Sequence, residues 1–97
     1  MKCQYSYVYI MTNDFHSVFY VGITADIQRR SWQHHEFPTG FVYKYNLTKL
    51  VYYEQFTEIG YAIRREKLMK RWRRSWKINL INKTNPQWKD LHEDLIR

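Results

Sequence analysis

The amino-acid sequence predicts an α/β (α+β) fold in which helices flank a small three-stranded antiparallel sheet. Three runs rich in aromatic and β-branched residues, at residues 5–11, 18–23 and 49–56, are typical of strands. Helices are indicated at residues 25–35, which follow a capping residue, and at residues 57–74, where apolar residues recur at spacings of three and four. With a short last helix, the element order is ββαβαα, which favours a sheet covered by helices.

The first two predicted strands form a hairpin, because the polar residues 12–14 between them favour a turn. The second strand leads into Gly22, whose lack of a Cβ lets the backbone turn or be closely approached. Thr24 is expected to cap the helix at residues 25–35. Asp26 then lies in its first turn, where the helix dipole favours an acid.

The middle of the chain contains one segment without periodicity. Residues 36–46 include Pro38 and Gly40, so we expect an exposed loop of the kind that often carries binding groups. After the third strand, Thr57 is expected to cap the long helix, which ends near residue 74. A short helix at residues 76–81 should follow.

The chain of 97 residues predicts a single domain spanning residues 1–97, because a second core could not be built from what remains. The content of 44% hydrophobic and 19% aromatic residues argues for a packed core and against disorder. No apolar run reaches the roughly 18 residues of a membrane span. Cys3 is the single cysteine, which excludes an internal disulfide, and the first five residues lack the apolar core expected of a signal peptide. We therefore expect a cytoplasmic protein.

The formal net charge of +7 predicts attraction to polyanions. Half of the basic residues lie in a segment at residues 64–77, which we call the basic segment and which holds one acid. Because a solvated helix face normally mixes both signs, we favour a nucleic-acid surface over such a face and over a membrane-surface helix. The basic residues are Arg64, Arg65, Lys67, Lys70, Arg71, Arg73, Arg74 and Lys77.

The acid in the basic segment is Glu66. On a helical wheel it falls between Ile59 and Ala62, within the apolar face of the predicted helix. A carboxylate turned toward a core is costly unless a partner compensates it. One interpretation is a salt bridge with Arg30 or another arginine. The other is a ligand for a hard divalent cation such as Mg²⁺, which commonly takes one or two carboxylates and completes its shell with water and phosphate oxygens.

Arg30 and His34 lie four residues apart, so their side chains share one face of the first predicted helix. The planar fork of an arginine suits phosphate, and a histidine can transfer a proton or donate a hydrogen bond. Tyr7 and Tyr9 share one face of the first strand by alternation, and Tyr20 lies on the neighbouring strand. Each residue also has a plainer interpretation, as a surface residue or a favoured strand former. A phenol acts as a base only where a cation stabilises the phenolate.

Two segments resemble the two-part signature of the GIY-YIG nuclease family. The first is Tyr7-Val8-Tyr9-Ile10, in which Val8-Tyr9 stands for the Ile-Tyr of the family, and the second is Phe19-Tyr20-Val21-Gly22. Arg30 falls at the position of the family's catalytic arginine, and His34 at a position often occupied by His or Tyr. Glu66 resembles the metal-binding glutamate of the second major helix.

The chain departs from the family pattern at two positions. Tyr7 replaces the Gly of the first part, and Ile23 stands where some members carry a Lys after the second. The family also has an asparagine near the end of the domain, for which Asn79, Asn82 and Asn85 are candidates. We prefer Asn85, although an asparagine before a proline also makes a plain helix-terminating turn.

The resemblance covers nearly the whole chain and implies a small stand-alone bacterial endonuclease that acts in DNA repair or recombination. The implied reaction is hydrolysis of a DNA phosphodiester bond, with RNA as an open alternative substrate, and with one Mg²⁺ or Mn²⁺ held by Glu66. Arg30 would bind the non-bridging oxygens. Tyr9 or Tyr20 would accept the proton of the attacking water, directly or through a network that includes His34. Tyr7 and the basic segment would contact the nucleic acid.

Two alternatives to a self-sufficient nuclease stay open. The first is a non-catalytic nucleic-acid-binding module, in which Trp72, Trp76, Tyr43 and Tyr45 stack on single-stranded bases between basic residues. A plainer interpretation of Trp72 is that it belongs to the core. The second alternative is a nuclease domain that acts only through a protein partner.

Overall fold

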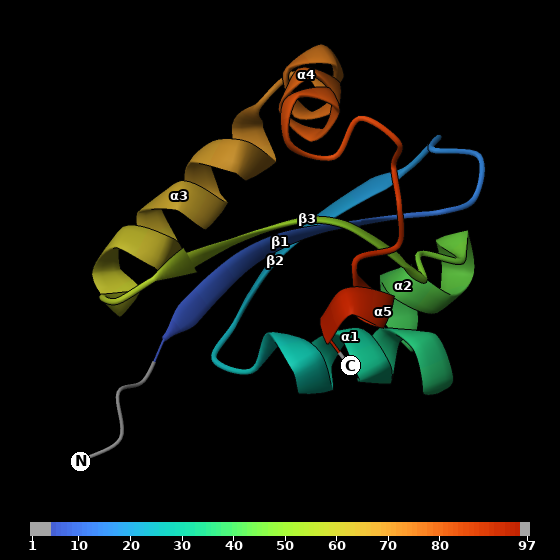
Figure 1. Ribbon diagram of the computed structural model, residues 1–97, viewed down its shortest axis with the longest axis horizontal. Coiled ribbons are helices and arrows are strands. Elements are labelled where there is room, and N and C mark those ends of the chain that lie inside the picture. Colours follow the sequence, from blue (N-terminus) through green and yellow to red (C-terminus); the bar gives the residue numbers. More distant parts are fainter. Residues whose placement is uncertain (1–4, 96–97) are drawn as a thin grey trace.

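The computed structural model describes residues 5–95 and shows a three-stranded antiparallel sheet with helices on both faces (Figure 1). Cys3 lies outside the described residues. The predicted fold class is confirmed. The elements, in chain order, are β1 (Ser6–Thr12), β2 (Phe19–Thr24), α1 (Ile27–Glu36), α2 (Gly40–Tyr45), β3 (Lys49–Phe56), α3 (Ile59–Arg71), α4 (Arg74–Thr84) and α5 (His92–Leu95).

The sheet has the order β2-β1-β3, so β1 is central and β2 and β3 are the edge strands. In the register of the β1–β2 pair, Tyr9 faces Gly22 and Met11 faces Tyr20. On the other side of β1, Tyr9 faces Tyr53, and an irregularity in the pairing follows at Ile10 and Met11. The central position of β1 therefore buries Tyr9 between two neighbouring strands.

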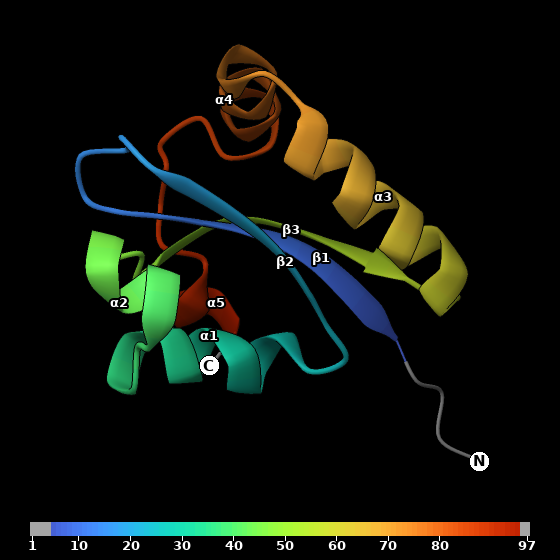
Figure 2. The same cartoon turned by 180° about the vertical axis from the view of Figure 1, so that it is seen from behind.

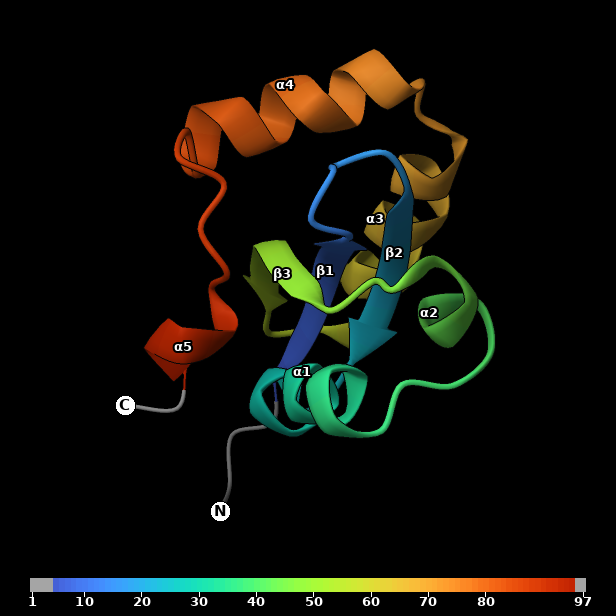
Figure 3. The same ribbon diagram turned by 90° about the vertical axis from the view of Figure 1, so that its right-hand side faces the viewer.

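The alternation of side chains along β1 divides the core into two layers. Val8 and Ile10 pack against Ala62, Met69 and Ile81, which belong to α3 and α4. On the opposite face, the second layer is formed by residues of the strands, α1, α2 and the segment after α2, and these are Tyr9, Met11, Ile27, Val42, Leu47 and Leu50. Figure 3 shows α1 and α5 on one side of the sheet and α3 and α4 on the other, and Figure 2 shows the same separation from behind.

The first helix begins two residues later than expected. Asp26, rather than Thr24, is its N-cap, because the Asp26 carboxylate accepts a hydrogen bond from the backbone N–H of Arg29 (3.1 Å). The hydroxyl of Thr24 instead accepts from the backbone N–H of Asp26 (3.1 Å). Two potential capping residues thus form successive turns, and the second one starts the helix.

The predicted loop at residues 36–46 contains a helix, α2, so this prediction was wrong. Its six residues are too few for a periodic apolar pattern. The helix is held by tertiary contacts, since Val42 and Leu47 are buried in the core. It ends at Asn46, whose left-handed backbone (φ 58°) lets its N–H reach the carbonyl of Tyr43.

The long predicted helix is shorter than expected and turned about its axis, and the short helix expected at residues 76–81 is longer, as α4. The long helix starts after Glu58 rather than Thr57, and α3 and α4 are separate helices joined at an extended Trp72. Ala62 and Met69 face the core as expected, but Ile59 is 62% exposed, which corrects its assignment to the apolar face. The buried face includes instead the partly covered Glu66. Sheet contact, rather than the most apolar arc, therefore decides the orientation of α3.

The C-terminal segment ties α1 to β3. The backbone N–H of Leu91 donates to the carbonyl of Leu50 (2.7 Å), and a carboxylate oxygen of Asp90 accepts from the backbone N–H of Leu50 (3.2 Å). The second oxygen of Asp90 lies 2.8 Å from Nε2 of His35 on α1. The buried hydroxyl of Ser31 lies 2.6 Å from Nδ1 of His92. These contacts fix the helix that carries Arg30 and His34.

No helix within residues 5–95 is both long and apolar enough to cross a membrane.

Candidate active site

Tyr9 and His34 form the centre of the candidate site. The phenol oxygen of Tyr9, on β1, lies 3.1 Å from Nε2 of His34, on α1. Tyr9 is 1% exposed, and burial, together with the neighbouring Tyr20, raises its pKa to about 12. Burial, reinforced by the charge of Arg30, lowers the pKa of His34 to about 4. At neutral pH both groups are therefore uncharged, and a proton can be shared along the hydrogen bond between them.

Gly22 makes room for this pair. It lies directly opposite Tyr9 on β2, and a Cβ at this position would lie 2.5 Å from Cζ and Oη of Tyr9 and 2.9 Å from Cε2 of Tyr20. The ring centroids of the two tyrosines are 6.2 Å apart, and that of Tyr20 is 6.0 Å from that of His34. The missing side chain, rather than an unusual backbone angle, explains the glycine here.

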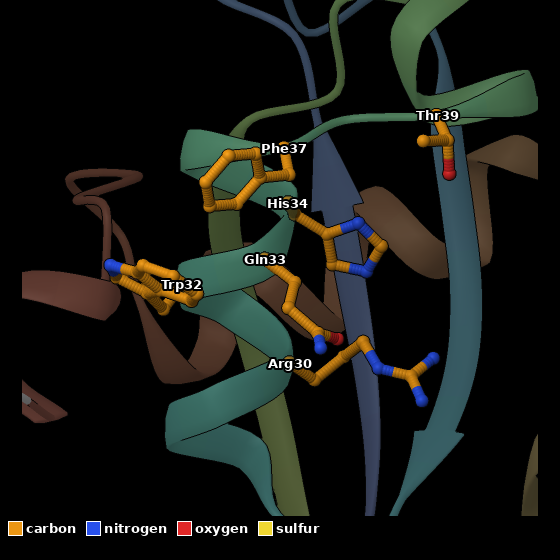
Figure 4. Close-up of a pocket in the computed structure, with 6 residues that line it drawn as sticks. All are labelled: Arg30, Trp32, Gln33, His34, Phe37 and Thr39. Carbon is orange, nitrogen blue, oxygen red and sulfur yellow. The ribbon is translucent and has the colours of Figure 1, made fainter.

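Arg30 stands at the open side of the pair. Its positive charge lowers the pKa of His34. It also lowers the pKa of Tyr9, although burial has the larger, opposite effect there. Arg30 and His34 point to the same side of α1, toward β1 and β2 (Figure 4). They line a pocket of about 480 Å³ with Trp32, Gln33, Phe37 and Thr39. A planar guanidinium beside a neutral imidazole suits a phosphate oxyanion.

Glu66 belongs to α3, which lies on the other face of the sheet from α1 (Figure 3). Its side chain is 14% exposed and its Oε2 lies 2.8 Å from Nζ of Lys70, one turn further along α3. The hydrogen bond to Glu66 is the largest cause of the raised pKa of Lys70, and Tyr20 also acts on it. Lys70 and Tyr20 line a second pocket, of about 490 Å³, with Phe19, Val21, Phe41 and Lys77.

The basic segment is divided between structural and exposed cations. Arg65 donates through Nε to Glu54 (2.9 Å), and Arg74 donates to the backbone carbonyls of His16 (2.7 Å) and Ser17. Lys77 is half-buried, and burial lowers its pKa. The exposed members that are not tied to another element in this way are Arg64, Lys67, Lys70, Arg71 and Arg73. Four of these, all except Arg73, line a pocket of about 500 Å³ together with Leu68. These exposed cations are thus the ones available to a polyanion.

Residues 5–79 match the family model described as GIY-YIG catalytic domain. The chain belongs to the GIY-YIG family. Comparison with curated proteins, and with solved structures, gave no significant match. The GIY-YIG family is one of nucleases, which implies a nucleic-acid substrate, and its members are generally metal-dependent.

The donor chemistry of this GIY-YIG chain suits a metal ion held by one carboxylate. Within residues 5–95 there is no group of three or more His, Cys, Asp or Glu side chains that could enclose a metal. Glu66 uses one oxygen toward the half-exposed Lys70, and Lys70 lines a pocket open to solvent. Mg²⁺ commonly binds through one carboxylate, waters and substrate phosphate, and so the arrangement fits such an ion and does not fit an all-protein cage.

Two further candidate residues, Tyr7 and Asn85, bond to neighbouring parts of the fold. The hydroxyl of Tyr7 donates to Oε1 of Gln55 on the neighbouring strand (3.4 Å). Its ring meets that of Tyr53 edge to face, with centroids 6.3 Å apart. Asn85, which lies beyond the matched range, donates to the carbonyls of Val51 (3.1 Å) and Lys89 (2.9 Å). Its Oδ1 accepts from the backbone N–H of Lys89 (3.1 Å). These bonds give Asn85 a structural role at the end of α4.

Replacing Asn85 by Ala is expected to lower the free energy of unfolding by about 1–3 kcal/mol, because the buried backbone groups it bonds would lose their partners. Chemical denaturation measures the change. The control is Asn79→Ala, an exposed position on the same helix, where little change is expected. Normal stability combined with lost cleavage would instead place Asn85 in the reaction.

Sequence reasoning missed Gln33 and the contacts that Phe41 and Lys70 make at the site. Gln33 lines the pocket beside His34, Phe41 contacts Tyr20 with a ring distance of 6.2 Å, and Lys70 pairs with Glu66. Phe41 lay in the segment expected to be a loop, where no spacing rule predicts contacts. The i,i+4 spacing of Glu66 and Lys70 was a usable signal, since such pairs are neighbours on a helix.

Proposed function

We propose that this GIY-YIG protein is a metal-dependent endonuclease that hydrolyses DNA phosphodiester bonds. The observation that carries the proposal is the hydrogen-bonded Tyr9–His34 pair beside Arg30. Glu66 is linked to this pair through Lys70, which bonds to Glu66 and interacts with Tyr20. A nucleic-acid-binding module needs cations and flat surfaces, but it has no need for a desolvated phenol–imidazole pair. The burial of Tyr9 therefore favours catalysis over binding alone.

Arg30 binds the scissile phosphate. Phosphodiester hydrolysis places additional negative charge on the non-bridging oxygens, and a guanidinium fixed in advance stabilises that charge without reorganising. The pocket lined by Arg30 and His34 is open to solvent and spacious enough for a phosphate and its sugar. Arg30 is a positioning and charge-stabilising group in this scheme, not an acid or base.

Tyr9 and His34 move the proton of the attacking water. With a pKa of about 12, Tyr9 is a phenol at neutral pH and can accept the proton only as it gives up its own. His34 lies within hydrogen-bond distance of the phenol oxygen and is neutral, so it takes that proton through Nε2. An entering phosphate anion raises the basicity of His34, which couples proton transfer to substrate binding. Tyr20 is the second phenol within reach of the same ring.

Glu66 is the residue that would hold the metal. When bound, Mg²⁺ or Mn²⁺ neutralises phosphate charge and stabilises the leaving oxygen. Glu66 is presented by the rigid helix α3, and Lys70 keeps its carboxylate compensated in the absence of a cation. The nearby Lys70 and the exposed residues of the basic segment then contact the DNA backbone. Such contacts position the substrate and carry no sequence information.

The proposal is tested by incubating the protein with plasmid, linear and branched DNA, and with RNA, in Mg²⁺, in Mn²⁺ and in EDTA. The variant Arg30→Ala is expected to reduce kcat/KM roughly 100- to 1000-fold, as for the loss of one preorganised charge-stabilising donor. DNA binding should weaken only modestly. Arg29→Ala is the matched control, because Arg29 is the exposed neighbour on the same helix.

Equal losses of binding and cleavage in Arg30→Ala would assign Arg30 to docking alone. Binding without metal-dependent cleavage of any of these substrates would contradict the nuclease assignment and favour the non-catalytic module. Cleavage that appears only after addition of cell extract would favour a domain that works through a protein partner.

A further inference from the structure

The pocket on α1 has two unlike sides. Arg30 and His34 point to one side, Trp32 points to the opposite side, and Gln33 lies between them (Figure 4). Trp32 is 45% exposed, Phe37 is 66% exposed, and their rings contact edge to face with centroids 5.3 Å apart. The pocket thus has a cationic side, a polar amide at its centre and an exposed aromatic side.

The aromatic side is not explained by the core. Neither Trp32 nor Phe37 belongs to the two buried clusters that hold the helices on the sheet. Exposing two large aromatic side chains together is unfavourable in water, so such pairs typically mark a binding surface. The two side chains line the same pocket as Arg30 and His34, the candidate phosphate-binding residues. A ligand that fills this pocket must therefore carry both an anionic group and a flat apolar group.

We propose that this pocket binds one unpaired nucleobase next to the scissile phosphate, an inference that rests on the proposed nuclease function. A nucleotide matches the two sides of the pocket, because it carries an anionic phosphate at one end and a flat base at the other. Its phosphate meets Arg30 and His34, and its flat base stacks on Trp32 and Phe37. The amide of Gln33 offers a donor and an acceptor to the edge of the base. Stacking is tolerant of sequence because every base has a π-face.

A base can enter this pocket only if it is free of its partner strand. The protein therefore selects substrates with an unpaired nucleotide at the cleavage point, such as single strands, flaps or extruded bases. A second exposed aromatic pair, next to Tyr20, supports this selection. Phe41 and Tyr45 of α2 have ring centroids 4.7 Å apart, and those of Phe41 and Tyr20 are 6.2 Å apart. Exposed aromatic pairs thus adjoin both the pocket of Arg30 and His34 and the ring of Tyr20.

The test measures binding in EDTA, so that it does not depend on cleavage. Fluorescence anisotropy compares a short labelled single strand with the blunt duplex of the same sequence. The double variant Trp32→Ala/Phe37→Ala is expected to bind the single strand roughly 5- to 100-fold more weakly, the usual effect of losing one stacked base. Its affinity for the duplex should stay close to that of the unchanged protein. Phe15→Ala removes an exposed aromatic residue in the β1–β2 loop and serves as the control.

The conservative single variant Trp32→Phe keeps an aromatic surface. It should retain most of the single-strand affinity of the unchanged protein, and circular dichroism checks that both variants are folded. A single abasic position moved along the strand should weaken binding to the unchanged protein at one location, and have little effect on the double variant. Equal loss of affinity for single strand and duplex, or no loss for either, overturns the proposal. If the unchanged protein showed no preference for the single strand but cleaved duplex in a metal-dependent way, the nuclease function would stand and only the base pocket would be overturned.

Discussion

Replacing Glu66 by Gln is expected to abolish metal-dependent cleavage while leaving nucleic-acid binding almost unchanged. The amide keeps the shape of a side chain that is largely covered by the fold, but it removes the negative charge that a hard cation requires. A metal ion contributes several kcal/mol of transition-state stabilisation, so the rate should fall by roughly a thousandfold or more. Titration of cleavage against Mg²⁺ and Mn²⁺ measures the loss.

Two control variants separate metal binding from the salt bridge. Glu58→Gln removes an exposed carboxylate just before the same helix and should leave cleavage intact. Lys70→Met breaks the ion pair from its other end. If cleavage required the ion pair itself, the variants Glu66→Gln and Lys70→Met would show the same loss of kcat. Because Lys70 also contacts the DNA in our proposal, kcat is compared at saturating DNA. Retention of kcat in Lys70→Met together with its disappearance in Glu66→Gln would assign the carboxylate to the metal.

Replacing Gly22 by Ala is expected to disable the site by displacing Tyr9. The added Cβ would lie 2.5 Å from the phenol carbon and oxygen of Tyr9, and the buried ring has no solvent side toward which it can move. We expect a cost of about 1–3 kcal/mol in stability, as for an overpacked core. The cleavage rate should fall by about 100-fold, because displacement by about 1 Å disrupts the hydrogen bond to His34.

Gly60→Ala provides the matched control for Gly22→Ala. Gly60 lies in the first turn of α3, and no atom from another part of the described chain lies within 4 Å of the position that its Cβ would take. An alanine there should be neutral or stabilise the helix by up to about 1 kcal/mol. Thermal unfolding and cleavage rates are compared for both variants. Full activity in Gly22→Ala would contradict the requirement for Tyr9 at its observed position.

The strands were predictable because their signal is local. Residues 49–56 were assigned with the observed bounds of β3, and β1 and β2 differ from the prediction by one residue at each end. Aromatic and β-branched side chains suit a pleated surface wherever it lies in the fold. The ends of helices were less predictable, because Thr24 and Asp26 are both good capping residues, and only the competition between them decides the first turn.

Burial of the site was partly predictable from helical spacing. The wheel assigned Glu66 to the covered face of its helix, and the side chain is indeed largely covered. The same wheel assigned Ile59 to that face, where it is mostly exposed, because α3 contacts the sheet along a narrower line than its apolar residues span. A wheel gives relative directions around a helix and carries no information on where the sheet is.

The sequence by itself determined the family signature, the spacing that puts Arg30 and His34 on one helical face, and the excess of basic residues in one segment. Tertiary structure alone decided which of those cations are free, since Arg65 and Arg74 bond to distant parts of the chain. It also placed Lys70, the partner of Glu66, where it interacts with Tyr20 of the edge strand β2, and it set Tyr9 against His34. These features depend on contacts between segments far apart in the chain, whose geometry follows from packing rather than from local spacing.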